Sequence, residues 1–332
     1  MIEETRALGR TGLRSGPIAF GGAQIGNFAV PISSDQAIET VEAAWDGGIR
    51  YFDVAPHYGL GLAEERLGMA LASRPRNEFI VSTKVGRLLV PNPDGPTPDD
   101  QGFVVTSPLM RIYDFSRDGI LRSIDGSLRR LQLDRIDVVY VHDPDEYYPQ
   151  ALNEAFPALE ELRSQGVIAS YGAGMNQAEM LADFVRYTDA DVMMGAGLLT
   201  LLDQSALEDL APEAERRGAS IVAAAPFNSG LLATAHPSTE ATFNYAKAPA
   251  GLVDRAERIA ELCVSHGVTL PAAALQYPLR SRAVSSVCVG MRSPSQVRGN
   301  LELMATGIPE EFWADLDASG LLRPAPRSLG RR

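Results

Sequence analysis

The feature that most constrains the fold of this 332-residue chain is a repeated pairing of a short apolar segment with an amphipathic one. The pairing occurs eight times along the chain. The apolar segments have the near-continuous hydrophobicity of strands buried on both faces of a parallel sheet. The predicted strands are residues 17–25, 51–56, 79–86, 136–144, 168–175, 192–197, 220–227 and 285–291. The predicted helices that follow them are residues 34–48, 63–73, 117–133, 153–166, 177–188, 205–218, 251–267 and 293–305, with a further helix at 270–282.

Strand–helix units in such a succession favour one closed barrel. Parallel neighbours need a long crossover, which each helix supplies. We therefore expect an α/β fold, a (β/α)8 TIM barrel that forms a single domain over residues 1–332, with a tail from about 306. The alternative is an open, doubly wound sheet, but GGAQIG at 21–26 lacks the G-x-G-x-x-G spacing of a dinucleotide-binding turn.

Three segments lie outside the repeat and are predicted to decorate the barrel. Residues 5–15 have the pattern of an N-terminal β-hairpin. Residues 87–116 and 228–250 are long loops after the third and seventh strands. Because barrel enzymes carry their sites at the C-terminal ends of the strands, these loops are expected to shape the mouth of the barrel.

Composition excludes several classes of partner and compartment. The chain has 30 Lys and Arg against 42 Asp and Glu, a formal net charge of -12, which disfavours nucleic-acid and membrane-surface partners. No apolar run approaches the roughly 18 residues of a membrane span. Two cysteines are too few for a disulfide framework and fit a reducing cytosol, so we expect a cytoplasmic protein.

Four polar residues fall at or just after the ends of the second, third and fourth predicted strands: Asp53, Tyr58, Lys84 and His142. Each alone has an ordinary structural interpretation, such as a cap, a half-buried aromatic ring, a surface charge or a satisfied imidazole. Together, at adjacent strand ends of one barrel, they favour a common site. A buried lysine needs a partner, and Asp53 is the obvious one.

The motifs that carry these residues resemble those of the aldo-keto reductase superfamily over nearly the whole chain. They are GIRYFDVAPHYG (48–59), VSTKVG (81–86) and DVVYVHDPD (137–145), followed by GAGMNQ (172–177) and GMRSPSQVRGNLE (290–302). The resemblance implies nicotinamide-dependent hydride transfer without a metal. It implies a catalytic tetrad of Asp53, Tyr58, Lys84 and His142.

In that tetrad Tyr58 exchanges a proton with the substrate oxygen, and His142 donates a hydrogen bond to it. A phenol normally titrates near 10 and is a poor base at neutral pH. We therefore expect the Lys84 cation, held charged by Asp53, to lower the pKa of Tyr58.

The resemblance also implies the cofactor-binding residues. They are Met175, Asn176, Phe227, Ser229, Gly230, Leu231, Gly290, Arg292, Gln296 and Asn300. Relatives that prefer NADP place Lys and Arg where this chain has Gly290 and Gln296, so NAD is the expected cofactor and NADP the alternative. Arg292 and Arg298 lie close enough in sequence to substitute for those cations.

Residues 198–233 resemble a subgroup that includes aldose 1-dehydrogenases and pyridoxal 4-dehydrogenase, which oxidise cyclic hemiacetals to lactones. The expected partner is a small sugar, such as L-fucose or a D-threo-aldose, or a pyridoxal-type molecule, bound by a monomer or homo-oligomer. His57, Tyr113 and Asp143 are candidates to line the substrate pocket. Other hypotheses are an NADPH-dependent carbonyl reductase, a non-catalytic nicotinamide-binding module, and a lyase using Lys84 as a Schiff-base nucleophile.

Overall fold

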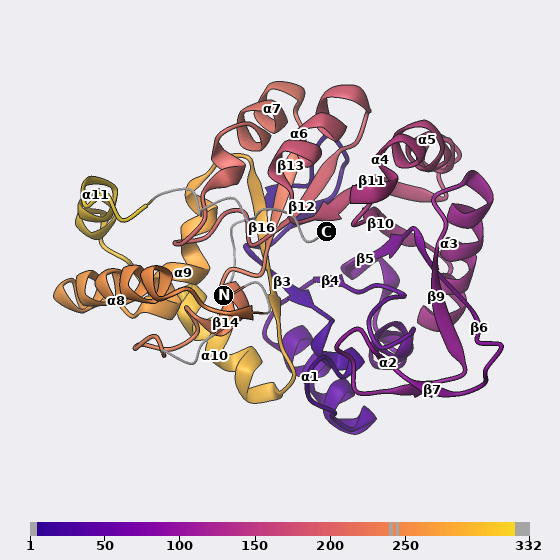
Figure 1. The fold of residues 1–332 in the computed structure, drawn as a ribbon, viewed down its shortest axis with the longest axis horizontal. Coiled ribbons are helices and arrows are strands. Elements are labelled where there is room, and N and C mark those ends of the chain that lie inside the picture. Colours follow the sequence, from indigo (N-terminus) through magenta and orange to yellow (C-terminus); the bar gives the residue numbers. More distant parts are fainter. Residues whose placement is uncertain (1–4, 239–241, 244–245, 323–332) are drawn as a thin grey trace.

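The computed structural model describes residues 5–238, 242–243 and 246–322. Within these residues eight parallel strands close into a barrel, which confirms the predicted (β/α)8 architecture. Figure 1 shows the strands grouped at the centre with the helices arranged outside them. In chain order the barrel strands are β3 (Ile18–Gly21), β4 (Tyr51–Asp53), β5 (Ile80–Val85), β10 (Ile136–His142), β11 (Ile168–Met175), β12 (Val192–Ala196), β13 (Ser220–Ala224) and β16 (Val284–Gly290).

The helices cover the outside of the barrel (Figure 1). Helix α1 begins where predicted, with the hydroxyl of Ser33 accepting a hydrogen bond from the amide of Gln36 at 3.1 Å. It ends before Gly48, whose φ of 90° is a conformation that glycine adopts without strain. The helices are α1 (Ser34–Asp46), α2 (Leu62–Leu71), α3 (Arg117–Leu131), α4 (Tyr148–Gln150), α5 (Phe156–Ser164), α6 (Ala178–Tyr187), α7 (Leu210–Arg217), α8 (Ala250–Ser265), α9 (Leu270–Gln276), α10 (Pro294–Ala305) and α11 (Glu310–Ala318).

Alternation along the strands divides the apolar residues between two cores. Side chains that point outward pack under the helices, in a large cluster that includes Val139 and Leu159. Side chains that point inward fill the barrel in a smaller cluster that includes Tyr51, Tyr140 and Leu8. The hydroxyls of Tyr51 and Tyr140 are hydrogen-bonded at 2.8 Å, which satisfies both phenols inside the barrel.

The segments outside the barrel repeat lie where the sequence predicts them, but their secondary structure was only partly predicted. The predicted N-terminal hairpin is present as β1 (Arg6–Ala7) and β2 (Arg14–Ser15). Residues 87–116 hold two antiparallel ladders: β6 (Arg87–Pro91) with β9 (Leu109–Tyr113), and β7 (Thr97–Pro98) with β8 (Thr106–Ser107). These ladders were not predicted, because this Pro- and Gly-rich segment has no regular alternation of apolar and polar residues.

The second long loop and the tail are also partly described. Residues 228–250 contain the short ladder β14 (Thr242–Phe243) with β15 (Ala246–Lys247). The end of the predicted tail, residues 323–332, lies outside the described residues. The predicted helix at 270–282 is shorter than expected: α9 ends at Gln276 and a 3-10 turn follows at Tyr277–Arg280, where Pro278 has no amide to continue the helix.

Candidate active site

The C-terminal ends of β4 and β5 bring together a buried ion pair. Nζ of Lys84 donates to Oδ2 of Asp53 at 2.6 Å and to the carbonyl oxygen of Val54 at 3.0 Å. The other carboxylate oxygen of Asp53 accepts from the hydroxyl of Ser82 at 2.7 Å. Strand alternation explains the grouping, since Asp53 is paired in register with Ser82, two residues before Lys84 on the same face of β5. The sequence therefore identified the partner of Lys84 correctly.

Tyr58 and His142 lie beside this pair. Nζ of Lys84 is 4.7 Å from the centre of the Tyr58 ring. The rings of Tyr58 and His142 meet edge to face, with their centres 6.0 Å apart. His142 ends β10, and Gly59, which follows Tyr58, has a φ of 65° and a Cα so close to Gly26 that a Cβ would lie 2.3 Å from the Gly26 carbonyl oxygen. The four residues of the expected tetrad thus converge on one side of the mouth.

Burial and neighbouring charges act in opposite directions on the pKa values of Tyr58 and Lys84. Burial raises the pKa of the Tyr58 phenol above its usual range, although the Lys84 ammonium lowers it. Lys84 thus acts on the pKa of Tyr58 in the expected direction, but desolvation of the phenolate outweighs the nearby cation and the net pKa is raised. Burial alone lowers the pKa of Lys84, but Asp53 and Tyr58 outweigh it and the net pKa is raised. Lys84 therefore stays protonated, which makes it a poor Schiff-base nucleophile.

The imidazole of His142 is neutral. Burial, followed by the positive charges of Arg87 and Lys84, lowers its pKa well below the usual range. A neutral imidazole still carries one N–H, so it can donate a hydrogen bond to a substrate oxygen without delivering its own positive charge. Its Nδ1 is buried without a hydrogen-bond partner in the described part of the chain.

The insertion after β5 supplies a wall of the mouth that sequence reasoning missed. Arg87, the first residue of β6, donates to Oδ2 of Asp143 at 2.5 Å and lies 3.3 Å from Nε2 of His57. Its guanidinium is also 5.5 Å from the ring centre of Tyr113. Arg87 thus joins the three residues proposed from the sequence to line the substrate pocket.

Phe103 is a second residue of this wall that the sequence did not reveal. Its ring centre is 5.1 Å from that of His57 and 6.0 Å from that of Tyr58. Nearby, the guanidinium of Arg111 donates to a carboxylate oxygen of Asp99 and to the carbonyl oxygen of His57. No local signal identifies these residues, because their approach to Tyr58 depends on how the insertion folds back.

The expected cofactor residues follow the ends of three barrel strands, β11, β13 and β16. Met175 is buried at the end of β11, and Asn176 after it is exposed. Phe227 is half-buried, Ser229 and Gly230 are exposed, and Leu231 is buried, all just after β13. Gly290 ends β16, Arg292 lies just before α10, Gln296 is in its first turn and Asn300 is near its middle. Since β13, β16 and β3 are neighbours in the barrel, the loops after these strands lie together.

Unpaired buried amide groups support the assignment of this end to a cofactor. Both side-chain polar atoms of Asn228 are buried without a partner in the described residues, as is Oε1 of Gln24 after β3. Asn228 also has a φ of 46° and Ser229 a φ of 57°, a backbone conformation that is uncommon outside glycine. A nicotinamide dinucleotide, with its many polar atoms, would fit donors and acceptors held in this way.

Gln296, one of the two positions expected to distinguish NAD from NADP, is engaged by its own helix. Ser293 caps α10 by accepting from the amide of Gln296 at 3.3 Å, as its sequence predicts. Oε1 of Gln296 accepts in turn from the amide of Arg292 at 2.9 Å. A Cβ at Gly290 would lie 2.3 Å from Oε1 of Gln24, so a side chain there would require the Gln24 amide to move. These two positions therefore present no cation to a ribose phosphate.

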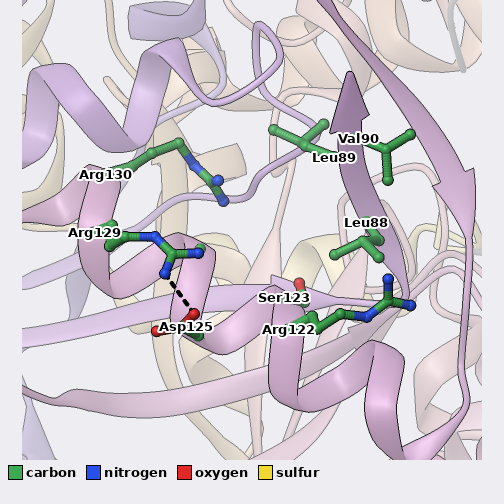
Figure 2. A pocket seen from close by; sticks show the side chains of 9 residues that line it. Leu88, Leu89, Val90, Arg122, Ser123, Asp125, Arg129 and Arg130 are labelled. Carbon is green, nitrogen blue, oxygen red and sulfur yellow. Dashed lines mark hydrogen bonds and ion pairs between the residues drawn. The ribbon is translucent and has the colours of Figure 1, made fainter. Parts of the chain in front are cut away.

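A separate hollow lies on the flank of the barrel, between β6 and α3 (Figure 2). It has a volume of about 220 Å³ and is lined by apolar side chains of β6 and by arginines of α3. Its arginines have carboxylate partners: Arg129 with Asp125, as Figure 2 shows, and Arg130 with Glu64. None of the tetrad residues lines it, so it is distinct from the mouth.

In the described residues, no helix is long and apolar enough to cross a membrane.

Comparison with known proteins gives a consistent picture over nearly the full length. The model of the aldo/keto reductase family matches residues 17–320. A D-threo-aldose 1-dehydrogenase from a Pseudomonas species is 46% identical over 324 residues, which cover 96% of this chain and 98% of that protein. A pyridoxal 4-dehydrogenase from Microbacterium luteolum is 41% identical over 337 residues, with coverage of 96% and 98%.

Solved structures agree with the fold. A glycerol dehydrogenase from Gluconobacter oxydans superposes with a TM-score of 0.79 at 25% identity, over 100% of both chains. An aldo-keto reductase from Bacillus halodurans, in its holo form, superposes with a TM-score of 0.76 at 26% identity, over 99% of both chains.

Proposed function

The chain belongs to the aldo/keto reductase family and is a nicotinamide-dependent oxidoreductase, and from that premise we propose that it oxidises the cyclic hemiacetal of an aldose to a lactone, with NAD as cofactor. The observation that carries the proposal is the convergence of Tyr58 and His142 on the buried Lys84–Asp53 pair. The relative that acts on D-threo-aldoses, at 46% identity, supports the substrate class.

The bound nicotinamide would supply the hydride acceptor for the C–H hydrogen of the hemiacetal carbon. Tyr58 takes the proton of the hemiacetal hydroxyl as the C–O bond becomes the carbonyl of the lactone. His142, as a neutral donor, keeps a hydrogen bond on the same oxygen while charge develops there. Lys84 stabilises the phenolate that Tyr58 must form, and Asp53 keeps Lys84 charged and in place.

The residues at the cofactor end support binding of the dinucleotide across the loops after β11, β13, β16 and β3. Asn176, Phe227, Ser229, Gly230 and Leu231 are proposed to contact the nicotinamide half and the pyrophosphate. Met175, buried at the end of β11, is proposed to lie beside the nicotinamide, and Gly290, Arg292, Gln296 and Asn300 are proposed to contact the adenosine. The absence of a side chain at Gly290 and the neutral amide of Gln296 support NAD over NADP.

One relative favours a second candidate substrate. The pyridoxal 4-dehydrogenase at 41% identity covers as much of the chain, and pyridoxal also forms a cyclic hemiacetal. In either case His57, Tyr113 and Asp143, which meet at Arg87, are proposed to contact the substrate.

The proposal is tested by following absorbance of the reduced cofactor, with NAD and NADP in parallel, against a panel of aldoses and pyridoxal. Tyr58→Phe is the matched variant, and we expect it to lower kcat by about 10²–10⁴-fold, the usual contribution of a general acid–base group. Cofactor binding, followed by quenching of protein fluorescence, should survive the substitution. Tight cofactor binding with no turnover of any substrate by the wild-type chain would instead support a non-catalytic binding module.

A further inference from the structure

Three ion pairs surround the reacting centre, and they differ in how far a substrate can reach them. Lys84–Asp53 and Arg111–Asp99 have side chains that are no more than 6% exposed. In the third pair Arg87 is 14% exposed and Asp143 is 32% exposed. Of the three, the Arg87–Asp143 pair is therefore the one that a molecule entering the mouth can contact.

This third pair lies directly beside the proposed catalytic imidazole. Oδ2 of Asp143 accepts from Arg87 at 2.5 Å and lies 3.6 Å from Nε2 of His142. The backbone of Asp143 is held at a φ of 43°, with its amide donating to the carbonyl oxygen of Gly174 at 3.0 Å. Residues other than glycine rarely adopt this backbone conformation. Tertiary contacts, and not the local preference of aspartate, therefore set the orientation of the Asp143 carboxylate.

The charges around the mouth are balanced. The cations whose charge acts on both His57 and His142 are Lys84, Arg87 and Arg111. Each has a carboxylate partner of its own. An anionic substrate would therefore meet no unpaired cation among these three, and it would meet the partly exposed carboxylate of Asp143.

A hydroxyl group is the functional group that suits such a pair. A guanidinium only donates hydrogen bonds and a carboxylate only accepts them, whereas a hydroxyl does both. Two hydroxyls on neighbouring carbons can therefore bridge Arg87 and Asp143 while the hemiacetal lies against Tyr58.

We propose that Arg87 and Asp143 form a donor–acceptor pair that determines specificity, recognising the hydroxyl groups of a neutral substrate and rejecting its phosphate ester. This inference rests on the proposed hemiacetal oxidation and adds to it the charge class of the substrate and a role for Arg87.

The first experiment is a thermodynamic cycle that combines substitution of a protein side chain with removal of one substrate hydroxyl. kcat/KM is measured for the best aldose and for each of its monodeoxy analogues, with the wild type, Arg87→Gln and Asp143→Asn. Loss of one hydrogen bond to a charged group should lower kcat/KM about tenfold to a hundredfold. For the analogue that lacks the recognised hydroxyl, the variants should lose no more than about twofold further. Equal losses with every analogue would overturn the proposal.

The second experiment measures a gain in activity toward a phosphorylated substrate, which damage to the fold cannot produce. Asp143→Asn leaves the guanidinium of Arg87 unpaired, so the ratio of kcat/KM for the aldose phosphate to that for the free aldose should rise at least about tenfold. An unchanged ratio would contradict the proposal. Arg129→Gln, in the exposed Arg129–Asp125 pair on the flank, is the matched control and should leave both measurements unchanged.

These outcomes are separate from those of the function itself. If the wild type reduces neither NAD nor NADP with any aldose or pyridoxal, the proposed function fails. If the wild type turns over and the cycle shows no coupling, only the role of Arg87 and Asp143 fails.

Discussion

The ammonium of Lys84 lies 2.6 Å from Oδ2 of Asp53 inside the barrel, and 4.7 Å from the centre of the Tyr58 ring. Both charged side chains are almost fully buried. Each charge has lost its water and depends on the other, so the pair serves Tyr58 only while it remains intact. This relationship makes the stability of the barrel and the chemistry at its mouth depend on the same two residues.

Removing both partners of this pair should destabilise the protein by less than the two single removals added together. Lys84→Met and Asp53→Asn are each expected to lower the free energy of unfolding by about 3–5 kcal/mol, because each leaves an uncompensated or poorly satisfied buried group. The double variant should lose less than the sum of the single losses. Urea denaturation measures all three. The exposed pair Arg129–Asp125 is the control, with a coupling energy below about 1 kcal/mol, and strictly additive losses at Lys84 and Asp53 would contradict the prediction.

Oxidation should accelerate with pH across the whole neutral range. Burial raises the pKa of Tyr58 despite Lys84, so the phenolate that accepts the substrate proton is the minor form at neutral pH. We expect kcat/KM for oxidation to rise through about pH 9 without a plateau, while reduction, which uses the protonated phenol, stays level. The measurement is a pH profile in both directions. A plateau for oxidation below about pH 8 would show that Lys84 outweighs burial after all.

Acid should destabilise the fold through His57. Burial, then the charges of Arg87, Arg111 and Lys84, lower the pKa of His57 to about 2. Between that value and the roughly 6.5 of an unfolded histidine, the unfolded chain binds the extra proton. The free energy of unfolding should therefore fall as the pH drops below about 6.5, by up to about 1.4 kcal/mol per pH unit for this group.

His57→Gln should remove that share of the slope. The lowered pKa of His142 acts in the same direction, so part of the acid sensitivity remains in the variant. Urea denaturation at several pH values between about 7.5 and 5 gives the slope. His236→Gln, which removes an exposed imidazole, is the matched control. An identical slope in His57→Gln and in the wild type would show that His57 titrates alike in both states.

A single cation at the start of α10 should shift the cofactor preference. Gln296→Arg is expected to raise the ratio of kcat/KM with NADP to that with NAD at least about tenfold, since a guanidinium can pair with the ribose phosphate. Arg292→Gln removes a cation close by. It should lower kcat/KM with NADP and leave kcat/KM with NAD unchanged. Parallel kinetics with both cofactors decide the matter, and an unchanged ratio in both variants would place the ribose phosphate elsewhere.

The catalytic half of the site was accessible to sequence reasoning, whereas its outer wall was not. Asp53 and His142 end regular strands and Lys84 is the last but one residue of its strand, and strand periodicity places the three side chains inside the barrel. Arg87 and Phe103 belong to an irregular insertion, and their contacts with His57 depend on the ladder between β6 and β9. The lowering of the Tyr58 pKa by Lys84 follows from the sequence, but the larger effect of burial does not, because desolvation is a property of the packed mouth.

By itself the sequence determined the repeating strand–helix units, and hence the barrel, because apolar periodicity and helix caps act over a few residues. It also determined which polar residues stand at the strand ends. Only the tertiary structure decided that the insertion folds back to set Arg87 against Asp143, that Asn228 is buried without a partner, and that burial outweighs Lys84 at Tyr58. These outcomes depend on contacts between distant segments and on the exclusion of water, which no local pattern encodes.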